Sequence, residues 1–126
     1  MRVNLSGGEW KLMNHLWAMG SSTIAELTAA VREETGWSKN TVITMLSRLE
    51  AKGAVHHRED GRAKRYSPAI ERGDAALAET ETFLSRVYGG SLGLMVSNLV
   101  ESRALSEADI AELSAILEKA GGEHHA

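Results

Sequence analysis

Hydrophobic residues recur at helical spacing through the first part of the chain and predict three short helices. A capping box, in which a serine or threonine is followed three residues later by glutamate, can begin the first helix at Ser6 and the second at Thr23. Ser38 can cap the third helix, which Gly36 precedes and Gly53 ends. The residues expected on the buried faces are Trp10, Met13 and Trp17, then Ile24, Leu27 and Val31, then Val42, Met45, Leu46 and Leu49.

The pattern changes after Gly53, where two short strand-like runs flank a turn. The runs 54–58 and 62–67 enclose Glu59-Asp60-Gly61, and Pro68 bounds the second run. An Asp-Gly pair suits a tight hairpin turn because glycine accepts a positive φ without a Cβ clash. Three short helices followed by a hairpin are typical of a winged helix-turn-helix.

Beyond Pro68 the pattern is helical. It predicts one helix that ends at Gly89-Gly90, a second capped by Ser91, and a last helix that begins with Ser106. Such short amphipathic helices cannot bury their apolar faces alone, so we expect a partner, most simply a second copy of the chain. The residues expected to make this dimer contact are Leu77, Phe83, Leu84, Val87, Leu92, Val96, Leu99, Ile110, Leu113 and Leu117.

Composition excludes several classes of protein. Among the 126 residues, no apolar run approaches the ~18 residues of a membrane helix, so we expect a cytoplasmic protein without membrane insertion. Cysteine is absent, which removes disulfides and thiolate chemistry. No G-x-S-x-G, H-E-x-x-H or phosphate-binding glycine loop is present, so we expect no catalytic residues and no cofactor.

Charge divides the chain into two parts. Residues 1–70 carry 10 Lys and Arg against 7 Asp and Glu, a net charge of +3, whereas residues 71–126 carry 4 against 10, a net charge of −6. A cationic first part and an anionic second part fit DNA binding by the former and self-association by the latter.

The helix from Ser38 to Lys52 separates into an apolar face and a polar one. A helix of this length is roughly 20 Å long, and its first turns fit a major groove roughly 12 Å wide. Asn40 can pair with an adenine edge, and Thr41 or Thr44 can meet a thymine methyl group. The residues predicted to contact DNA from this helix are Lys39, Asn40, Thr41, Thr44, Ser47 and Arg48.

An isolated amphipathic helix would more simply have a solvated polar face, and the hairpin that follows changes this interpretation. The hairpin carries His56, His57, Arg58, Arg62, Lys64 and Arg65. Arg62 at the turn is the expected phosphate contact, while Lys64 and Arg65 fit either a DNA contact or a solvated strand, and Lys64 is included in the predicted site.

The expected fold class is mainly α with a small β-hairpin, a winged helix-turn-helix followed by a helical dimerisation arm. The expected domains are a DNA-binding domain over 1–70, a helical dimerisation domain over 71–120 and a disordered tail over 121–126.

Segments of the chain match those of a known family. In the first part these are Glu9-Trp10, Leu16-Trp17-Ala18-Met19-Gly20, Trp37-Ser38-Lys39-Asn40-Thr41-Val42, Leu46-Ser47-Arg48-Leu49, Lys52-Gly53-Ala54 and Gly61-Arg62-Ala63-Lys64-Arg65-Tyr66-Ser67-Pro68. In the second part they are Phe83-Leu84, Gly90-Ser91-Leu92, Val96-Ser97-Asn98-Leu99-Val100-Glu101 and Leu105-Ser106. On these segments the chain resembles the BlaI/MecI family of penicillinase repressors from Leu5 to Leu117.

The resemblance implies a homodimer that occupies a dyad-symmetric operator in double-stranded DNA and blocks transcription, often of genes for β-lactam resistance. It implies that Asn40, Thr41 and Thr44 read bases and that Arg62 is a wing contact. Many members carry proline then lysine where this chain has Lys39-Asn40, so the operator sequence stays open.

The resemblance also implies a mode of release from DNA. In the family, a membrane sensor metalloprotease, or a protease that it activates, cuts the dimerisation arm at an asparagine followed by an apolar residue. Asn98-Leu99 occupies that place in this chain. Leu99 also fits a packed helix face, whether or not the bond is cut.

Three alternatives stay open or are weakened by the sequence. The chain could be a winged-helix repressor that answers another signal without proteolysis, or an adaptor that binds only proteins. A metal sensor is disfavoured, because His56-His57 would face opposite ways on a strand and the terminal pair His124-His125 lacks further ligands.

Overall fold

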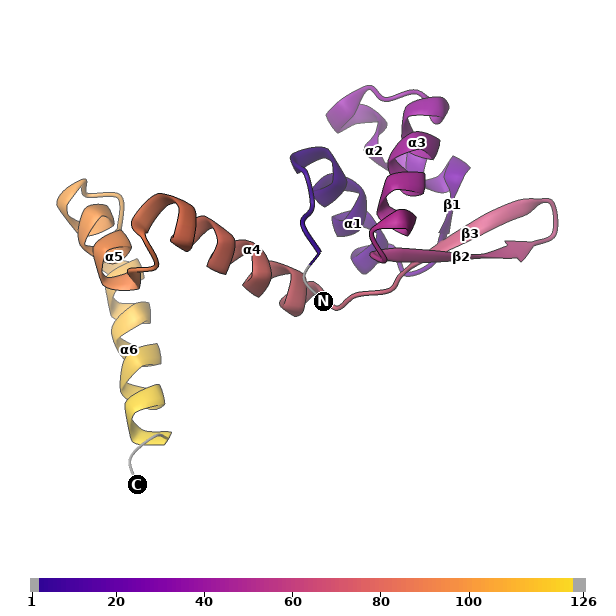
Figure 1. Cartoon of the computed structure of the whole chain (residues 1–126). Helices are drawn as coiled ribbons and strands as arrows, with labels where there is room; N and C mark the ends of the chain where they lie inside the picture. Colours follow the sequence, from indigo (N-terminus) through magenta and orange to yellow (C-terminus); the bar gives the residue numbers. More distant parts are fainter. Residues whose placement is uncertain (1–2, 124–126) are drawn as a thin grey trace. The chain divides into compact units, whose positions relative to one another are not determined.

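A computed structural model of the chain describes residues 3–123 and contains two compact units, whose boundary falls between Glu81 and Thr82. The elements are α1 (Gly7–Met19), β1 (Ser22–Thr23), α2 (Ile24–Thr35), α3 (Lys39–Ala51), β2 (Val55–Asp60), β3 (Ala63–Pro68), α4 (Arg72–Tyr88), α5 (Leu92–Glu101) and α6 (Glu107–Glu123) (Figure 1). The first unit therefore has the element order of a winged helix-turn-helix, as predicted. The division into functional domains at residue 70 stays a prediction.

Local caps determine where the first three helices begin. The Ser6 hydroxyl accepts from the Glu9 amide at 3.2 Å, and the Glu9 carboxylate accepts from the Ser6 amide at 2.7 Å. Thr23 and Glu26 form the same box before α2, and the Ser38 hydroxyl accepts from the Thr41 amide before α3. These side chains satisfy amides that have no partner within the helix. The predicted helix starts are confirmed.

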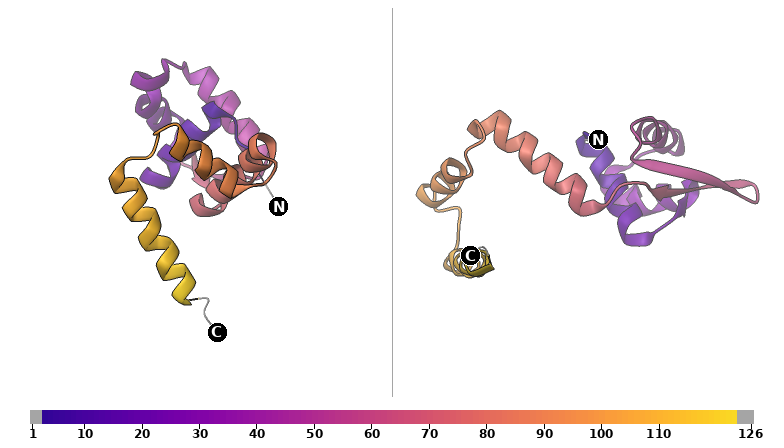
Figure 2. Two further views of the ribbon diagram at one scale, coloured as in Figure 1. Left: turned by 90° about the vertical axis from the view of Figure 1, so that its left-hand side faces the viewer. Right: turned by 60° about the horizontal axis from the view of Figure 1, so that its bottom comes forward.

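The sheet has three antiparallel strands in the order β1-β3-β2, so the hairpin gains a strand that the sequence did not predict. Ser22 of β1 pairs with Tyr66, and two residues are too few to show the alternation that indicates a strand. In the hairpin, Asp60 pairs with Ala63, so the turn is Gly61-Arg62 and not Glu59-Asp60-Gly61. Gly61 has a φ of +66°, the left-handed conformation that glycine accepts without strain. The β2–β3 ribbon extends beyond the helices of its unit (Figure 2).

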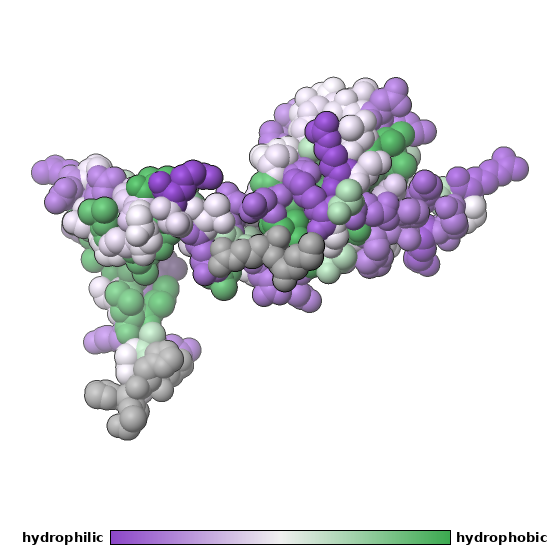
Figure 3. All heavy atoms as spheres, in the orientation of Figure 1, coloured by the Kyte–Doolittle hydropathy of each residue, from purple (hydrophilic) through white to green (hydrophobic). Residues whose placement is uncertain are grey.

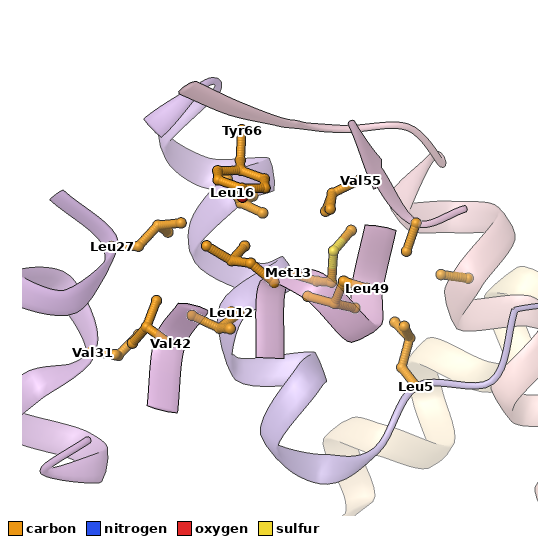
Figure 4. Close-up of a cluster of buried hydrophobic side chains, with 13 residues drawn as sticks. Leu5, Leu12, Met13, Leu16, Leu27, Val31, Val42, Leu49, Val55 and Tyr66 are labelled. Carbon is orange, nitrogen blue, oxygen red and sulfur yellow. The ribbon is translucent and has the colours of Figure 1, made fainter. Parts of the chain in front are cut away.

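One hydrophobic core joins the helices of the first unit to the sheet. Side chains from α1, α2, α3, β2 and β3 point toward a common centre (Figure 4). The buried residues are Leu5, Leu12, Met13, Leu16, Leu27, Val31, Val42, Leu46, Leu49, Ala54, Val55, Tyr66 and Ala75. This core fixes α3 by its apolar face, because Val42, Leu46 and Leu49 are fully buried.

The predicted core faces of α1 and α3 need correction at three residues. Trp10 and Trp17 are half-buried, with ring centroids 5.8 Å apart, and Leu12 and Leu16 take the central positions. The Trp17 indole donates to the Ile70 carbonyl at 3.0 Å, which keeps this large side chain at the edge of the core. Met45 is also half-buried.

The second unit is formed by the end of α4 together with α5 and α6. Gly89 and Gly90 both have positive φ and end α4, and Ser91 caps α5, as predicted. The last helix continues through Gly121 and Gly122 to Glu123, because a low helix propensity weakens a helix without ending it. Residues 121–123 of the predicted disordered tail are therefore helical, and residues 124–126 lie outside the described part of the chain.

A buried carboxylate joins the start of α1 to the end of α3. Glu9 is 2% exposed, and its carboxylate contacts the Lys52 ammonium at 2.5 Å, at the end of α3. Lys52 also donates to the Asn4 carbonyl at 2.8 Å. Burial acts to raise the pKa of Glu9, but the hydrogen bonds from Lys52 and Ser6 outweigh burial and hold this pKa below its ordinary value of 4.5. The ionised form therefore stabilises the fold.

We expect Glu9→Gln to lower the free energy of unfolding by about 1–3 kcal/mol at neutral pH, because Lys52 loses its charged partner. A lowered pKa contributes stability above the unfolded-state pKa, and this contribution is lost as the pH falls through the folded-state pKa. The difference between the two proteins should therefore shrink below about pH 4.5. Urea unfolding followed by tryptophan fluorescence measures it, with the exposed Glu33→Gln as the control. A difference that is constant from pH 3 to pH 8 would contradict this role.

Candidate nucleic-acid interface

The outer face of α3 carries six polar residues at helical spacing. Lys39, Asn40, Thr44, Ser47 and Arg48 are exposed, and Thr41 is half-buried beside the cap. We call the six residues Lys39, Asn40, Thr41, Thr44, Ser47 and Arg48 the reading face. Its position follows from the core, since Val42, Leu46 and Leu49 occupy the opposite side of the helix.

Two hydroxyl groups of the reading face are already engaged within the helix. The Thr44 hydroxyl donates to the Asn40 carbonyl at 3.0 Å, and the Thr41 hydroxyl lies 3.1 Å from the Ser38 hydroxyl. Both threonines therefore offer their methyl groups more readily than a hydroxyl hydrogen. The Asn40 side chain is exposed and retains both a donor and an acceptor.

A shallow hollow of about 330 Å³ lies on this side of α3. Four residues of the reading face line it together with Met45. The sequence pattern placed Met45 wholly in the core, and the structure shows that it has one side on the core and one on the hollow. Its position at the border of the apolar face is the reason for the error.

The wing consists of β2, the Gly61-Arg62 turn and β3. Arg62 lies in the turn and Lys64 lies one position into β3, and both are exposed. Neither forms an ion pair with any of residues 3–123. The ribbon thus presents two exposed cations that form no ion pair with the described residues, although Lys64 lies across the ladder from Glu59.

Arg65 has a different place in the wing. Its guanidinium donates to Asp60 at 2.8 Å, to Glu26 at 3.3 Å and to the Ser21 carbonyl at 3.2 Å. The hydrogen bond from Arg65 is the main reason why the pKa of Asp60 lies below its ordinary value. Arg65 therefore joins the wing to the start of α2, a role that neither alternative drawn from the sequence included.

A second contact joins the wing to α3. The His57 Nδ1 atom lies 2.5 Å from a Glu50 carboxylate oxygen, and the His57 ring lies 5.3 Å from the Tyr66 ring. Glu50 is near the end of α3, so this pair connects the recognition-helix candidate directly to β2. Sequence reasoning missed this pair and the contacts of Arg65, because their partners are brought together only by the fold.

Residues 3–123 contain neither a metal-binding group nor a membrane-spanning helix. None of their His, Asp and Glu residues form a group of three that could hold a metal ion. None of their helices combines the length and apolar character needed to cross a membrane. His57 is occupied by Glu50, while His124 and His125 lie outside the described residues.

The predicted dimer residues are exposed or half-buried on the helices that carry them. Among residues 82–122, no side chain is buried. The exposed residues of the predicted set are Leu77, Phe83, Val87, Leu92, Ile110, Leu113 and Leu117, and the half-buried ones are Leu84, Val96 and Leu99. Hydrophobic side chains gather along α6 on the face shown in Figure 3.

An apolar groove of about 680 Å³ lies between α5 and α6, and we call it the arm groove. Its walls include Leu92, Val96 and Leu99 from α5 and Ile110, Leu113 and Leu117 from α6. The structure thus brings six predicted dimer residues together in one hollow. Phe83 lies elsewhere in this unit, with its ring 6.1 Å from that of Tyr88.

The Asn98–Leu99 bond lies in the last turn of α5. The Asn98 carbonyl accepts from the Ser102 amide at 3.0 Å and from the Ser102 hydroxyl at 2.8 Å, and the Asn98 side chain donates to the Tyr88 hydroxyl at 3.1 Å. The helix ends at Glu101, and Arg103 in the turn that follows has a φ of +57°, a conformation that non-glycine residues rarely adopt. A protease would need to open this turn to reach the bond.

Sequence comparison relates nearly the whole chain to known repressors. The profile of the family described as Penicillinase repressor matches residues 5–119. A penicillinase repressor of Bacillus licheniformis is 36% identical over 115 residues, which cover 91% of this chain and 90% of that protein. The methicillin resistance regulatory protein MecI of Staphylococcus aureus strain N315 is 30% identical over 91% of this chain and 94% of its own length.

Solved structures give the same relation for the first unit. The solution structure of the DNA-binding domain of the repressor BlaI matches with a TM-score of 0.53 and 33% identity, over 59% of this chain and 93% of that chain. The monomeric form of BlaI from Bacillus licheniformis, in complex with the blaP half-operator, matches with a TM-score of 0.50 and 34% identity, over 56% of this chain and 87% of that chain.

Proposed function

The chain belongs to the penicillinase repressor family, and we propose that it represses transcription by binding double-stranded operator DNA through α3 and the wing. This family consists of repressors and not of enzymes. The observation that carries the proposal is the exposed reading face on a helix fixed by its opposite side, next to a cationic wing. The relative whose structure contains a half-operator has the same fold in this part of the chain.

In this proposal α3 enters the major groove with its amino end first. The free amides and the positive end of the helix dipole favour phosphate there. Asn40 pairs with an adenine edge, the methyl groups of Thr41 and Thr44 contact thymine, and Lys39, Ser47 and Arg48 contact the neighbouring backbone or bases. Arg62 and Lys64 bind phosphates that flank the groove.

Salt dependence tests this arrangement. We expect operator affinity to fall steeply with added salt, because bound phosphates release counterions. Arg62→Ala should lower the affinity about fivefold and reduce the salt slope by about 1 for each bound half-site. Asn40→Ala should mainly relax the choice of one base, by about 1–3 kcal/mol of discrimination. Fluorescence anisotropy with operator and scrambled duplexes measures both effects.

Arg86→Ala is the charge-matched control, since it removes one cation from α4, outside the proposed interface. It should leave the affinity and the salt slope unchanged. Tight duplex binding that does not respond to salt would contradict the proposed phosphate contacts. Absence of binding to every promoter duplex would exclude the DNA-binding proposal and favour the second candidate function, an adaptor that binds only proteins.

We propose further that two copies of the chain associate through their helical arms. The support is physical: the described part of the second unit has no buried side chain, and it exposes leucines at up to 69% of their surface. A unit of this kind lacks a core of its own, and the arm groove offers apolar surface to a partner. Such a dimer would occupy a dyad-symmetric operator with half-sites about 34 Å apart.

Leu117→Asp tests the dimer contact, because Leu117 is 69% exposed in the single chain and lines the arm groove. We expect the dimer dissociation constant to rise about 100-fold, since each dimer loses two buried leucines. Ala115→Asp adds the same charge to α6 outside the groove and should leave the dimer intact. Analytical ultracentrifugation measures both. A wild-type chain that stays at 13.6 kDa at high micromolar concentration would contradict the dimer.

We also propose that the repressor is released when a membrane sensor metalloprotease, or a protease that it activates, cuts the Asn98–Leu99 bond. The family relation supports this proposal, and so does the position of the bond in the last turn of a helix, where local opening costs least. A cut there separates α6 from α5, and hence divides the arm groove. An unrelated inducer that acts without proteolysis is the alternative.

Mass spectrometry of the chain after incubation with its cognate, induced sensor should give fragments 1–98 and 99–126. Ser102→Ala should speed the cut, because the Asn98 carbonyl loses one of its two hydrogen bonds. Ser97→Ala is the control, because Ser97 is exposed and adjacent to Asn98, and its replacement leaves the Asn98–Leu99 bond unchanged. If the regulated genes are derepressed while the chain stays whole, the signal is not proteolytic.

A further inference from the structure

Met45 has an unusual place for a methionine of an amphipathic helix, because it belongs to two surfaces at once. One side is packed against the core, where its methyl group would lie only 2.9 Å from a Cβ atom added at Gly8 of α1. The Trp37 ring closes the same contact at 3.1 Å. The other side lines the hollow on the reading face, among four polar residues.

Met45 is the apolar residue of that hollow, because the other residues that line it are polar. Thr41 is four residues before it and Arg48 is three residues after it, so these three side chains form one row along α3. Asn40 and Thr44 form the adjacent row. The remaining walls are therefore an amide, two threonines and a guanidinium.

The major groove offers one apolar group to such a surface, the C5-methyl group of thymine. A thioether side chain is flexible and polarizable, and it adapts to an irregular apolar contact. Met45 is also held in place from behind by Gly8 and Trp37, so little side-chain freedom remains to be lost on binding. We propose that Met45 is a specificity-determining residue that contacts a thymine methyl group in each half-site.

This inference rests on the proposed binding of operator DNA and adds to it a residue that the apolar pattern assigned to the core. The inference also assigns a role to Gly8. A side chain at Gly8 would push the methionine methyl group or the Trp37 ring by a few tenths of an ångström. The absence of a side chain in α1 therefore sets the position of a base-contacting group in α3.

The test replaces one thymine at a time by deoxyuridine, which lacks only the methyl group, in the duplex that the protein protects on its own promoter. Positions that contact the methyl groups of Thr41 and Thr44 should respond in the wild type and in Met45→Ala alike. We expect one further position per half-site at which this change lowers wild-type affinity about fourfold through Met45, the effect of one buried methyl group. In Met45→Ala the affinity for the thymine duplex should fall by at least the same factor. Deoxyuridine at that position should then have no further effect.

Three further proteins make the outcome specific. Met45→Leu retains an apolar side chain and should retain the sensitivity to deoxyuridine. Met19→Ala removes an exposed methionine from α1 and should behave as the wild type. Gly8→Ala changes no residue of the reading face, yet it should reduce the sensitivity at the same position, and it tests the proposal even if Met45→Ala fails to fold.

Salt-dependent binding in which Met45→Ala and Gly8→Ala keep the full deoxyuridine sensitivity at every position would overturn the role of Met45. The proposed function would stand in that case. Failure of the wild-type chain to bind any promoter duplex would overturn both. Measured affinities therefore distinguish a wrong residue from a wrong function.

Discussion

The contact between the first turn of α1 and α3 is the constraint on which the reading face depends. Gly8 lets Trp37, which precedes the cap of α3, and Met45, in the middle of that helix, approach α1 closely. At the end of α3, the buried Glu9 carboxylate holds Lys52, which also donates to the Asn4 carbonyl. Neighbouring residues of one helix turn thus fix a helix of 13 residues at its middle and at its end. A buried carboxylate is costly to desolvate, and its hydrogen bond to an ammonium is strongly directional once formed.

The wing is held by two sets of side-chain contacts, made by Arg65 and by His57. Arg65 connects β3 to Asp60, Glu26 and Ser21, and His57 connects β2 to Glu50 of α3. Arg65 is thereby paired with Asp60 and Glu26, whereas Arg62 and Lys64 have no ion pair among residues 3–123. The same ribbon therefore separates a cation that positions it from cations that are available to an anionic partner.

Much of this arrangement could be predicted from the sequence because helix starts are local. The capping boxes at Ser6 and Thr23 join residues three apart and form as expected, and Ser38 caps α3 as expected. The features that the sequence did not predict depend on partners far along the chain. Lys52 lies 43 residues from Glu9, Arg65 lies 39 residues from Glu26, and β1 exists only because β3 pairs with it.

The border of a helix face is the other place where the pattern fails. Met45 has apolar spacing with Val42 and Leu49, yet it lies at the edge of the buried stripe. Spacing predicts the centre of a helix face more reliably than its margin. Successive residues are about 100° apart around the helix axis, so a residue at the margin of the buried stripe can face either surface. The predicted roles of the reading face, the dimer residues and Asn98-Leu99 stay predictions, since the fold places these residues without showing what they bind.

Charge and hydrophobicity together argue that the arm serves a protein partner and not DNA. The net charge of −6 over residues 71–126 is repelled by phosphate, while the arm groove presents leucines and valines to whatever covers it. A single reading face and wing make few contacts, and linking two copies makes the second half-site contact effectively intramolecular, at a local concentration in the ~mM range. Affinity for a two-fold operator would then depend on the arm as strongly as on α3. Dividing the arm groove would release the repressor without altering a single residue that reads the DNA.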